Sequence, residues 1–196
     1  MKEIAFSELM GEHVLSLVKS HGKNVKIHSL AKIANPQFAE IGDEVRILDY
    51  AFLDAKESLI IGSYSIICWH CVIEGHSNVL IGNRCFLGPG TKILGSTYII
   101  HGYYTSEHLP YGTHKTEYGN IVIQDDAYLG ANCVVMPGVT IGEGAVVGAN
   151  AFVSRDLEPW GIYVGAPARK VGERERPSIN RKRIIDSMEW MDIENK

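Results

Sequence analysis

The chain has 196 residues, of which 45% are hydrophobic and 21% charged, and its formal net charge is −4. This length and composition are typical of one globular domain, and the negative charge offers no general basic surface for nucleic acid. No stretch approaches the roughly 18 apolar residues of a membrane span, and the first residues do not read as a signal peptide. We therefore expect a cytoplasmic protein with no membrane span and no nucleic-acid partner.

Residues 1–24 are predicted to form an N-terminal helical cap. Apolar side chains recur there at helical spacing between Phe6 and Val18, and Gly22 ends the pattern. A cap is needed because the repeat that follows would otherwise expose unpaired strand edges at its first turn.

Aliphatic side chains then recur every six residues, with one interruption. The fifteen members are Ile41, Ile47, Leu53, Ile61, Ile67, Ile73, Ile81, Leu87, Ile93, Ile123, Leu129, Val135, Ile141, Val147 and Val153. A helix repeats near 3.6 residues, so a period of six indicates short strands joined by tight corners. Three six-residue units make one triangular coil, which predicts a mainly β fold.

Four residues after each of these aliphatic residues comes a second position that is predicted to point inward, and it usually holds a small side chain. Its occupants are Val45, Ala51, Ser65, Cys71, Ser77, Cys85, Thr91, Thr97, Ala127, Cys133, Val139, Ala145 and Ala151. The first three coils recur every 20 residues rather than 18, so we expect two residues to bulge at a corner, at 59–60 and again at 79–80. Glycine directly follows the repeat at positions 42, 62, 82, 88, 130, 142 and 148, where a corner can use its positive φ.

The cysteines raise the question of a metal. Cys68 and Cys71 have the spacing of some zinc or redox sites, but Cys71, Cys85 and Cys133 occupy the small inward position. A second cysteine pair at zinc spacing is missing from the sequence. We expect no metal.

The interruption spans residues 99–122 and is the expected functional segment. A loop this long between regular elements is more often functional than incidental. It carries three histidines and four tyrosines: His101, His108, His114, Tyr103, Tyr104, Tyr111 and Tyr118. These groups suit the wall of a cleft against a neighbouring subunit, although the tyrosines could equally anchor the loop by packing. Beyond the repeat, residues 173–196 are predicted to form a C-terminal helix.

Three segments carry a resemblance to a known family. They are residues 125–132 (Asp-Asp-Ala-Tyr-Leu-Gly-Ala-Asn), residues 137–144 (Pro-Gly-Val-Thr-Ile-Gly-Glu-Gly) and residues 157–168 (Leu-Glu-Pro-Trp-Gly-Ile-Tyr-Val-Gly-Ala-Pro-Ala). With the hexads, they resemble the left-handed parallel β-helix acyltransferases, above all the sugar acetyltransferases of surface-polysaccharide and nucleotide-sugar pathways. The resemblance covers about residues 25–172 and implies a left-handed β-helix. It also implies a homotrimer with active sites between subunits.

The same resemblance implies acetyl-CoA as the acyl donor. The positions that match its binding path in the family are Tyr128 and Ala131 for the pantetheine, Gly148, Ala149 and Ser154 toward the nucleotide end, and Arg169 and Lys170 for the phosphates. The positive charges suit phosphate binding. Without the resemblance, both would be taken as solvated surface residues.

The catalytic base is where the chain departs from the family pattern. Many members place a histidine just after the coil that precedes the loop, whereas this chain has Tyr98 there and His101 three residues later. A hydroxyl acceptor needs a general base and histidine is best suited, but an amine needs much less help. We favour His101 as the base or orienting group, then His108. The alternatives left open are His70, Glu74, His76 and Glu107.

These features predict direct transfer of an acetyl group from acetyl-CoA to the amino group of a sugar, expected to be nucleotide-linked, in surface-polysaccharide biosynthesis. The alternative is O-acetylation of a sugar hydroxyl. Two other classes are less favoured: a γ-type zinc carbonic anhydrase, whose histidine corner reads Leu87-Gly88-Pro89 here, and a catalytically silent scaffold. The sequence does not identify the sugar, its nucleotide or the acyl length.

Overall fold

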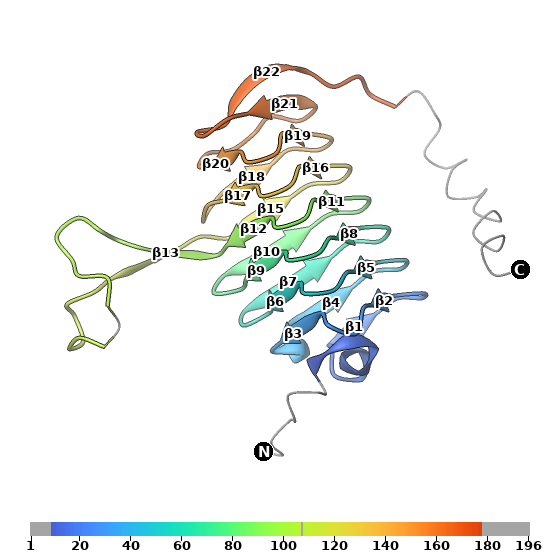
Figure 1. Ribbon diagram of the computed structural model, residues 1–196, viewed down its shortest axis with the longest axis horizontal. Helices are drawn as coiled ribbons and strands as arrows, with labels where there is room; N and C mark the ends of the chain where they lie inside the picture. Colours follow the sequence, from blue (N-terminus) through green and yellow to red (C-terminus); the bar gives the residue numbers. More distant parts are fainter. Residues whose placement is uncertain (1–8, 107, 178–196) are drawn as a thin grey trace, which may run out of the picture.

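The chain winds into a parallel β-solenoid with three walls, shown in Figure 1. This computed structural model describes residues 9–106 and 108–177. Wall 1 contains β1 (Ser20–His21), β4 (Ala39–Ile41), β7 (Ser58–Ile61), β10 (Asn78–Ile81), β15 (Ile121–Ile123) and β18 (Thr140–Ile141). Wall 2 contains β2 (Lys26–Ile27), β5 (Arg46–Ile47), β8 (Ile66–Ile67), β11 (Phe86–Leu87), β16 (Tyr128–Leu129), β19 (Val146–Val147), β21 (Gly161–Val164) and β22 (Arg169–Glu173). Wall 3 contains β3 (Lys32–Ala34), β6 (Phe52–Asp54), β9 (Val72–Glu74), β12 (Lys92–Leu94), β17 (Val134–Val135) and β20 (Phe152–Val153).

The predicted repeat forms the core. All fifteen members are buried, with at most 4% of each exposed. Neighbouring coils align them in register, as in the pairs Ile41↔Ile61, Ile61↔Ile81 and Ile81↔Ile123. The small inward positions are buried as well, apart from Thr97, which has left the coil. Each buried aliphatic side chain contributes roughly 1.5–3 kcal/mol, and coils contact mainly their neighbours.

The two extra residues of the 20-residue coils do not bulge at a corner, which corrects the prediction. They lengthen wall 1 instead: β7 and β10 have four residues each, and Leu59 and Val79 point inward beside Ile61 and Ile81. Because side chains alternate along a strand, the longer strand buries a second apolar side chain. A corner bulge would have left both residues exposed.

The repeat glycines also have a different role from the one predicted. None of the seven has a positive φ; the left-handed residue comes two positions later in each corner, as at Tyr64 (φ 63) and Arg84 (φ 57). Glycine is needed for close stacking between coils. A Cβ on Gly62 would lie 2.5 Å from the carbonyl carbon of Gly82 and 2.6 Å from the nitrogen of Asn83.

The ends of the solenoid differ from the predicted helical caps. The described part of the N-terminal cap is a 3-10 helix, Gly11–Ser16, with Val14 buried against the first coil, and the solenoid already begins at β1. A short 3-10 helix η3 (Pro36–Phe38) precedes β4. Residue 173 belongs to β22, which pairs antiparallel with β21, and the rest of the predicted C-terminal helix from residue 178 lies outside the described residues.

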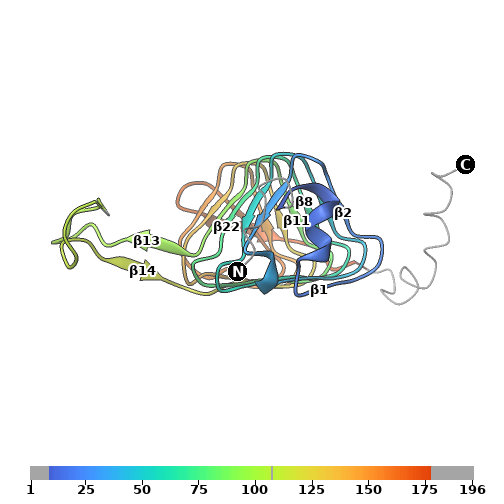
Figure 2. The ribbon, with the colours of Figure 1, turned by 90° about the horizontal axis from the view of Figure 1, so that it is seen from below.

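The predicted protruding loop is an antiparallel hairpin, which we call the arm (residues 96–118). Its stem is β13 (Ser96–Tyr98) paired with β14 (Thr116–Tyr118), and Figure 2 shows it projecting from one side of the prism. Its bounds differ from 99–122, because Ile121 and Val122 already lie in β15 and pair with neighbouring coils. The arm leaves from the corner between walls 3 and 1, which we call the 3–1 corner. Among the described residues, no helix has the length and apolarity of a membrane span.

Candidate functional site

Three polar side chains meet at the root of the arm. Glu74 ends β9, His76 follows it at the 3–1 corner, and Ser96 begins the arm one coil later. His76 Nδ1 lies 2.6 Å from Glu74 Oε1, and Ser96 Oγ donates to the same oxygen at 2.7 Å. Ser96 Oγ and His76 Nδ1 are 3.4 Å apart.

Tight stacking of the two coils brings this cluster together. A Cβ on Gly95 would lie 2.6 Å from the Glu74 carbonyl oxygen, and the Gly95 N–H donates to that oxygen at 3.1 Å. Ser77 Oγ donates to the Gly119 carbonyl at 2.8 Å, which ties the returning end of the arm to the same corner. The absence of a side chain at Gly95 therefore allows the arm to begin directly above Glu74.

The contact sets the tautomer of His76. An ionised carboxylate only accepts hydrogen bonds, so in the neutral imidazole Nδ1 carries the proton and Nε2 keeps a lone pair. The side chains of His76 and Glu74 are 34% and 28% exposed, so the pair is accessible from solvent. A carboxylate-oriented imidazole with a free Nε2 can act as a general base.

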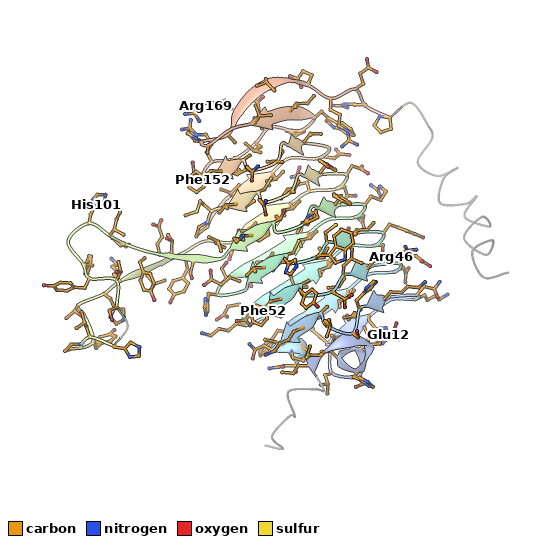
Figure 3. The ribbon with its side chains drawn as sticks, in the orientation of Figure 1. Glu12, Arg46, Phe52, His101, Phe152 and Arg169 are labelled. Carbon is orange, nitrogen blue, oxygen red and sulfur yellow. The ribbon has the colours of Figure 1, made fainter. Side chains whose placement is uncertain are left out.

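The histidines favoured from the sequence lie elsewhere. His101 and His108 are both exposed on the outer part of the arm, and Figure 3 shows His101 well away from the walls of the solenoid. Their roles stay predictions. His70 stacks on Tyr50, with ring centroids 5.0 Å apart, and Glu107 lies outside the described residues. Of the alternatives, only Glu74 and His76 are joined in one cluster.

Sequence reasoning named both of these residues but not their pairing. The available signal was a Glu-Gly-His segment at a corner, one coil below the start of the arm. Residues 74–76 also lie directly below Ser96 in the 20-residue register, because Glu74 pairs with Leu94 in the neighbouring strand.

The arm carries a hollow of about 470 Å³, which we call the arm hollow. It is lined by Tyr103, Tyr111, Gly112, His114, Lys115, Thr116 and Tyr118. Tyr118 pairs with Ser96 across the hairpin, so the inner end of the hollow lies opposite one member of the Glu74–His76–Ser96 cluster. The hollow brings aromatic and imidazole groups of the arm together, whereas their predicted role as a cleft wall against a neighbouring subunit stays a prediction.

Four of the residues predicted to bind the coenzyme lie on two edges of wall 3. Ala131, Gly148 and Ala149 belong to the corner between walls 2 and 3, where a Cβ on Gly130 would be 2.6 Å from Ala149 N. Ser154 lies at the 3–1 corner, after β20. Wall 3 separates the two groups, so the single chain does not gather them into one path.

Tyr128 occupies the outer face of wall 2. It is 43% exposed and stacks on Phe86, with ring centroids 5.1 Å apart and planes 5° from parallel. The ring can line a path for a pantetheine chain, as the resemblance implies, and that role stays a prediction.

Comparison with known proteins identifies the family. The model of the bacterial transferase hexapeptide (six repeats) matches residues 120–155. The dTDP-4-amino-4,6-dideoxy-D-glucose acyltransferase of Escherichia coli is 31% identical over 173 residues, which are 85% of this chain and 88% of that protein. The chain belongs to the hexapeptide-repeat acyltransferases.

A solved structure has the same fold. AntD, an N-acyltransferase from Bacillus cereus in complex with dTDP and 3-hydroxybutyryl-CoA, superposes with a TM-score of 0.76 at 29% identity, covering 91% of this chain and 93% of that chain. The expected left-handed parallel β-helix is thereby confirmed. Other relatives match in part: the chain spans 58% of the length of chloramphenicol acetyltransferase from Klebsiella aerogenes, at 31% identity over 124 residues, and 49% of a relative from Schizosaccharomyces pombe, at 33% identity over 107 residues.

Lys170 and Arg169, the two basic residues predicted to meet the CoA phosphates, differ in their ion pairs in this hexapeptide-repeat protein. Lys170 Nζ lies 2.7 Å from both Glu158 and Glu173, and these carboxylates raise the pKa of Lys170 above its ordinary value. Arg169 is exposed near the end of the solenoid, where Figure 3 labels it, and Nη1 donates to the Ala168 carbonyl at 3.1 Å. A phosphate would have to compete with two carboxylates for Lys170, so Arg169 is better placed to bind one.

The cysteines of this hexapeptide-repeat protein are buried and free. Three of their Sγ atoms contact backbone carbonyl oxygens: Cys71 to Gly88 at 3.2 Å, Cys85 to Gln124 at 3.2 Å and Cys133 to Gly148 at 3.1 Å. Burial raises the pKa of Cys71 to about 12 and that of Cys85 to about 11. Within the described parts of the chain, no three His, Cys, Asp or Glu side chains are grouped to hold a metal ion.

The cysteines are therefore expected to resist thiol reagents in the folded protein. Only the thiolate reacts, and at pH 8 burial keeps these thiols protonated and out of reach. Ellman's reagent should react with the four thiols only as denaturant unfolds the chain, so its absorbance should rise in parallel with the loss of the circular dichroism signal. Rapid release of one or more equivalents from the native protein would contradict this expectation.

Proposed function

We propose that this hexapeptide-repeat protein is an acetyltransferase that moves an acetyl group from acetyl-CoA to the amino group of a nucleotide-linked sugar. The similarity to the E. coli dTDP-4-amino-4,6-dideoxy-D-glucose acyltransferase over 85% of the chain carries the proposal. The fold shared with AntD, whose complex contains dTDP and an acyl-CoA, supports it. A cytoplasmic role in surface-polysaccharide biosynthesis belongs to the same proposal.

The Glu74–His76 pair supplies the proton chemistry in this mechanism. The acceptor nitrogen attacks the thioester carbonyl carbon, a C–N bond forms, and His76 Nε2 takes the proton that the nitrogen loses. The C–S bond then breaks, and the CoA thiolate leaves and accepts that proton from His76 Nε2. Glu74 holds the imidazole in the required tautomer, and a backbone N–H at a coil corner stabilises the negative charge that develops on the oxygen.

The proposed coenzyme path uses more than one subunit. Ala131 and Ala149 lie on one edge of wall 3, whereas His76 and Ser154 lie on the other. In the proposed homotrimer, the corner of one subunit that carries the alanines would lie against the arm root of the next. Tyr128 would then line the pantetheine with Ala131, and Gly148, Arg169 and Lys170 would extend the path toward the nucleotide end of CoA.

O-acetylation of a sugar hydroxyl is the second candidate, and the Glu74–His76 pair favours it. A hydroxyl has a pKa far above 7 and needs a general base during attack, whereas an amine needs less help. The sequence similarity favours an amine, so the chemical nature of the product, an amide or an ester, must decide between the two acceptors.

The test offers both acceptors to one preparation. Labelled acetyl-CoA is incubated with a dTDP-linked 4-amino-4,6-dideoxyhexose and, separately, with its 4-hydroxy counterpart, and products are followed by mass spectrometry. We expect acetylation of the amino sugar only, giving an amide that survives mild alkaline hydroxylamine. An ester that hydroxylamine removes would favour the second candidate. Coenzyme binding without transfer to either sugar would refute the acetyltransferase assignment for these acceptors.

A further inference from the structure

The arm hollow has a built-in order of chemical groups along the hairpin. Nearest the root, Tyr118 lies opposite Ser96, which hydrogen-bonds Glu74. The Lys115 carbonyl accepts from Ile99 N–H, one step farther out than the Thr116–Tyr98 pair. Tyr103 and Tyr111 lie beyond it. Moving outward, the lining therefore presents an aromatic ring, a cation and then two more aromatic rings.

The aromatic rings of the hollow are unusually open to solvent. Tyr118 is 61% exposed, Tyr103 41%, and Tyr111 is fully exposed. Exposed rings on a narrow hairpin gain little from packing, but such rings are suited to stacking on planar bases and on sugar rings. Glu117, between Thr116 and Tyr118 on β14, does not line the hollow.

The cation in the hollow is available to an anion. Lys115 Nζ lies 6.0 Å from the centroid of the Tyr103 ring, and no carboxylate of the described residues forms an ion pair with it, in contrast to Lys170. Next to it, His114 Nδ1 is buried and has no hydrogen-bond partner in the described structure. A buried polar atom without a partner is costly unless a ligand or neighbouring group satisfies it.

We propose that the arm hollow binds the nucleoside diphosphate of the acceptor. The base stacks on Tyr103 and Tyr111, the diphosphate meets Lys115, and the sugar lies on Tyr118 with its amino group toward His76. The order base, diphosphate, sugar follows the order of the lining from the tip of the arm to its root. The volume of about 470 Å³ lies within the usual range of ligand sites, about 300–1,000 Å³. This inference rests on the proposed function and assigns the substrate-recognition role to the arm.

The experiment measures binding rather than turnover. Isothermal titration of the 196-residue chain with dTDP, and separately with CoA, is compared for the wild type, Lys115→Gln and Tyr103→Ala. We expect each substitution to weaken dTDP binding about tenfold or more, because each removes one charged contact or one stacking ring, and to leave CoA affinity within about twofold. Lys26→Gln removes an exposed lysine of β2 on wall 2 and serves as the matched control, with dTDP affinity unchanged.

The outcomes separate this inference from the proposed function. Equal dTDP affinity in the wild type and both arm variants would overturn it, as would no dTDP binding at all, even where the wild type still acetylates the amino sugar. An arm hollow covered by a second copy of the chain would give that result. In activity assays, the arm variants should raise KM for the nucleotide sugar and leave kcat and KM for acetyl-CoA unchanged, which a general loss of structure would not do.

Discussion

Replacing His76 with asparagine is expected to lower kcat about 10²- to 10⁴-fold while CoA binding, measured by titration calorimetry, is retained. Asparagine keeps a polar side chain near Glu74 but has no nitrogen that can accept the proton of the attacking group. Because the imidazole is 34% exposed and lies at a corner rather than in the core, the thermal unfolding midpoint should change little. An amine acceptor places the loss toward the lower end of this range, since an amine depends less on the base.

Four further variants test the assignment of the base. Glu74→Gln should lose activity too, because an amide can donate to Nδ1 and so stabilise the tautomer that protonates Nε2. Ser96→Ala removes only a neighbouring hydroxyl and should have a smaller effect. His101→Asn and His108→Asn serve as matched controls on the arm. Full activity in His76→Asn together with inactivity of His101→Asn would identify His101 on the arm as the base and refute the role of the Glu74–His76 pair.

The Gly62→Ala variant is expected to be about 1–3 kcal/mol less stable than the wild type. Its Cβ would lie 2.5–2.6 Å from three backbone atoms of Gly82 and Asn83, and no flexible side chain is there to move aside. The two coils would have to separate at that corner. Urea unfolding followed by circular dichroism measures the loss as a lower midpoint at an unchanged slope.

Gly172→Ala is the matched control for this prediction. Around Gly172 the nearest atom that a Cβ would meet is Ile162 Cδ1 at 3.9 Å, an ordinary contact. That variant should be as stable as the wild type or slightly more so, because alanine has less freedom in the unfolded chain. Equal midpoints for Gly62→Ala and Gly172→Ala would show that close stacking is not what the repeat glycine provides.

The core could be read from the sequence because a strict period leaves little choice of which side chains point inward. The corner conformations could not be predicted in this way, because a glycine in the sequence can mean either close approach of two coils or a left-handed backbone conformation. At Gly62 it allows close approach of coils, whereas the left-handed conformation belongs to Tyr64, a residue type that gives no hint of it. Likewise, Leu59 could be placed in a bulge or in a longer strand, and only the packing against its neighbours decides.

The candidate site was harder to predict for a related reason. His101 is closest in sequence to the position at which the family places its histidine, so a reading along the chain favours it. The structure instead joins Glu74 and His76 to Ser96 through the stacking of one coil on another, a contact across 20–22 residues. Such pairings can be predicted from sequence only when the alignment of neighbouring coils is known with single-residue precision. The two extra residues in wall 1 left that alignment undecided.

The way the arm joins the solenoid separates recognition from folding. Gly119 N–H donates to the Gly95 carbonyl at 3.1 Å, so the coil closes behind the hairpin as though the 23 residues between were absent. None of the fifteen aliphatic repeat residues of the core lies in that insert. Hairpins of other lengths and compositions can thus replace the arm at this junction without changes to the core of the solenoid. A family built this way can acquire new acceptors by changes in the arm alone.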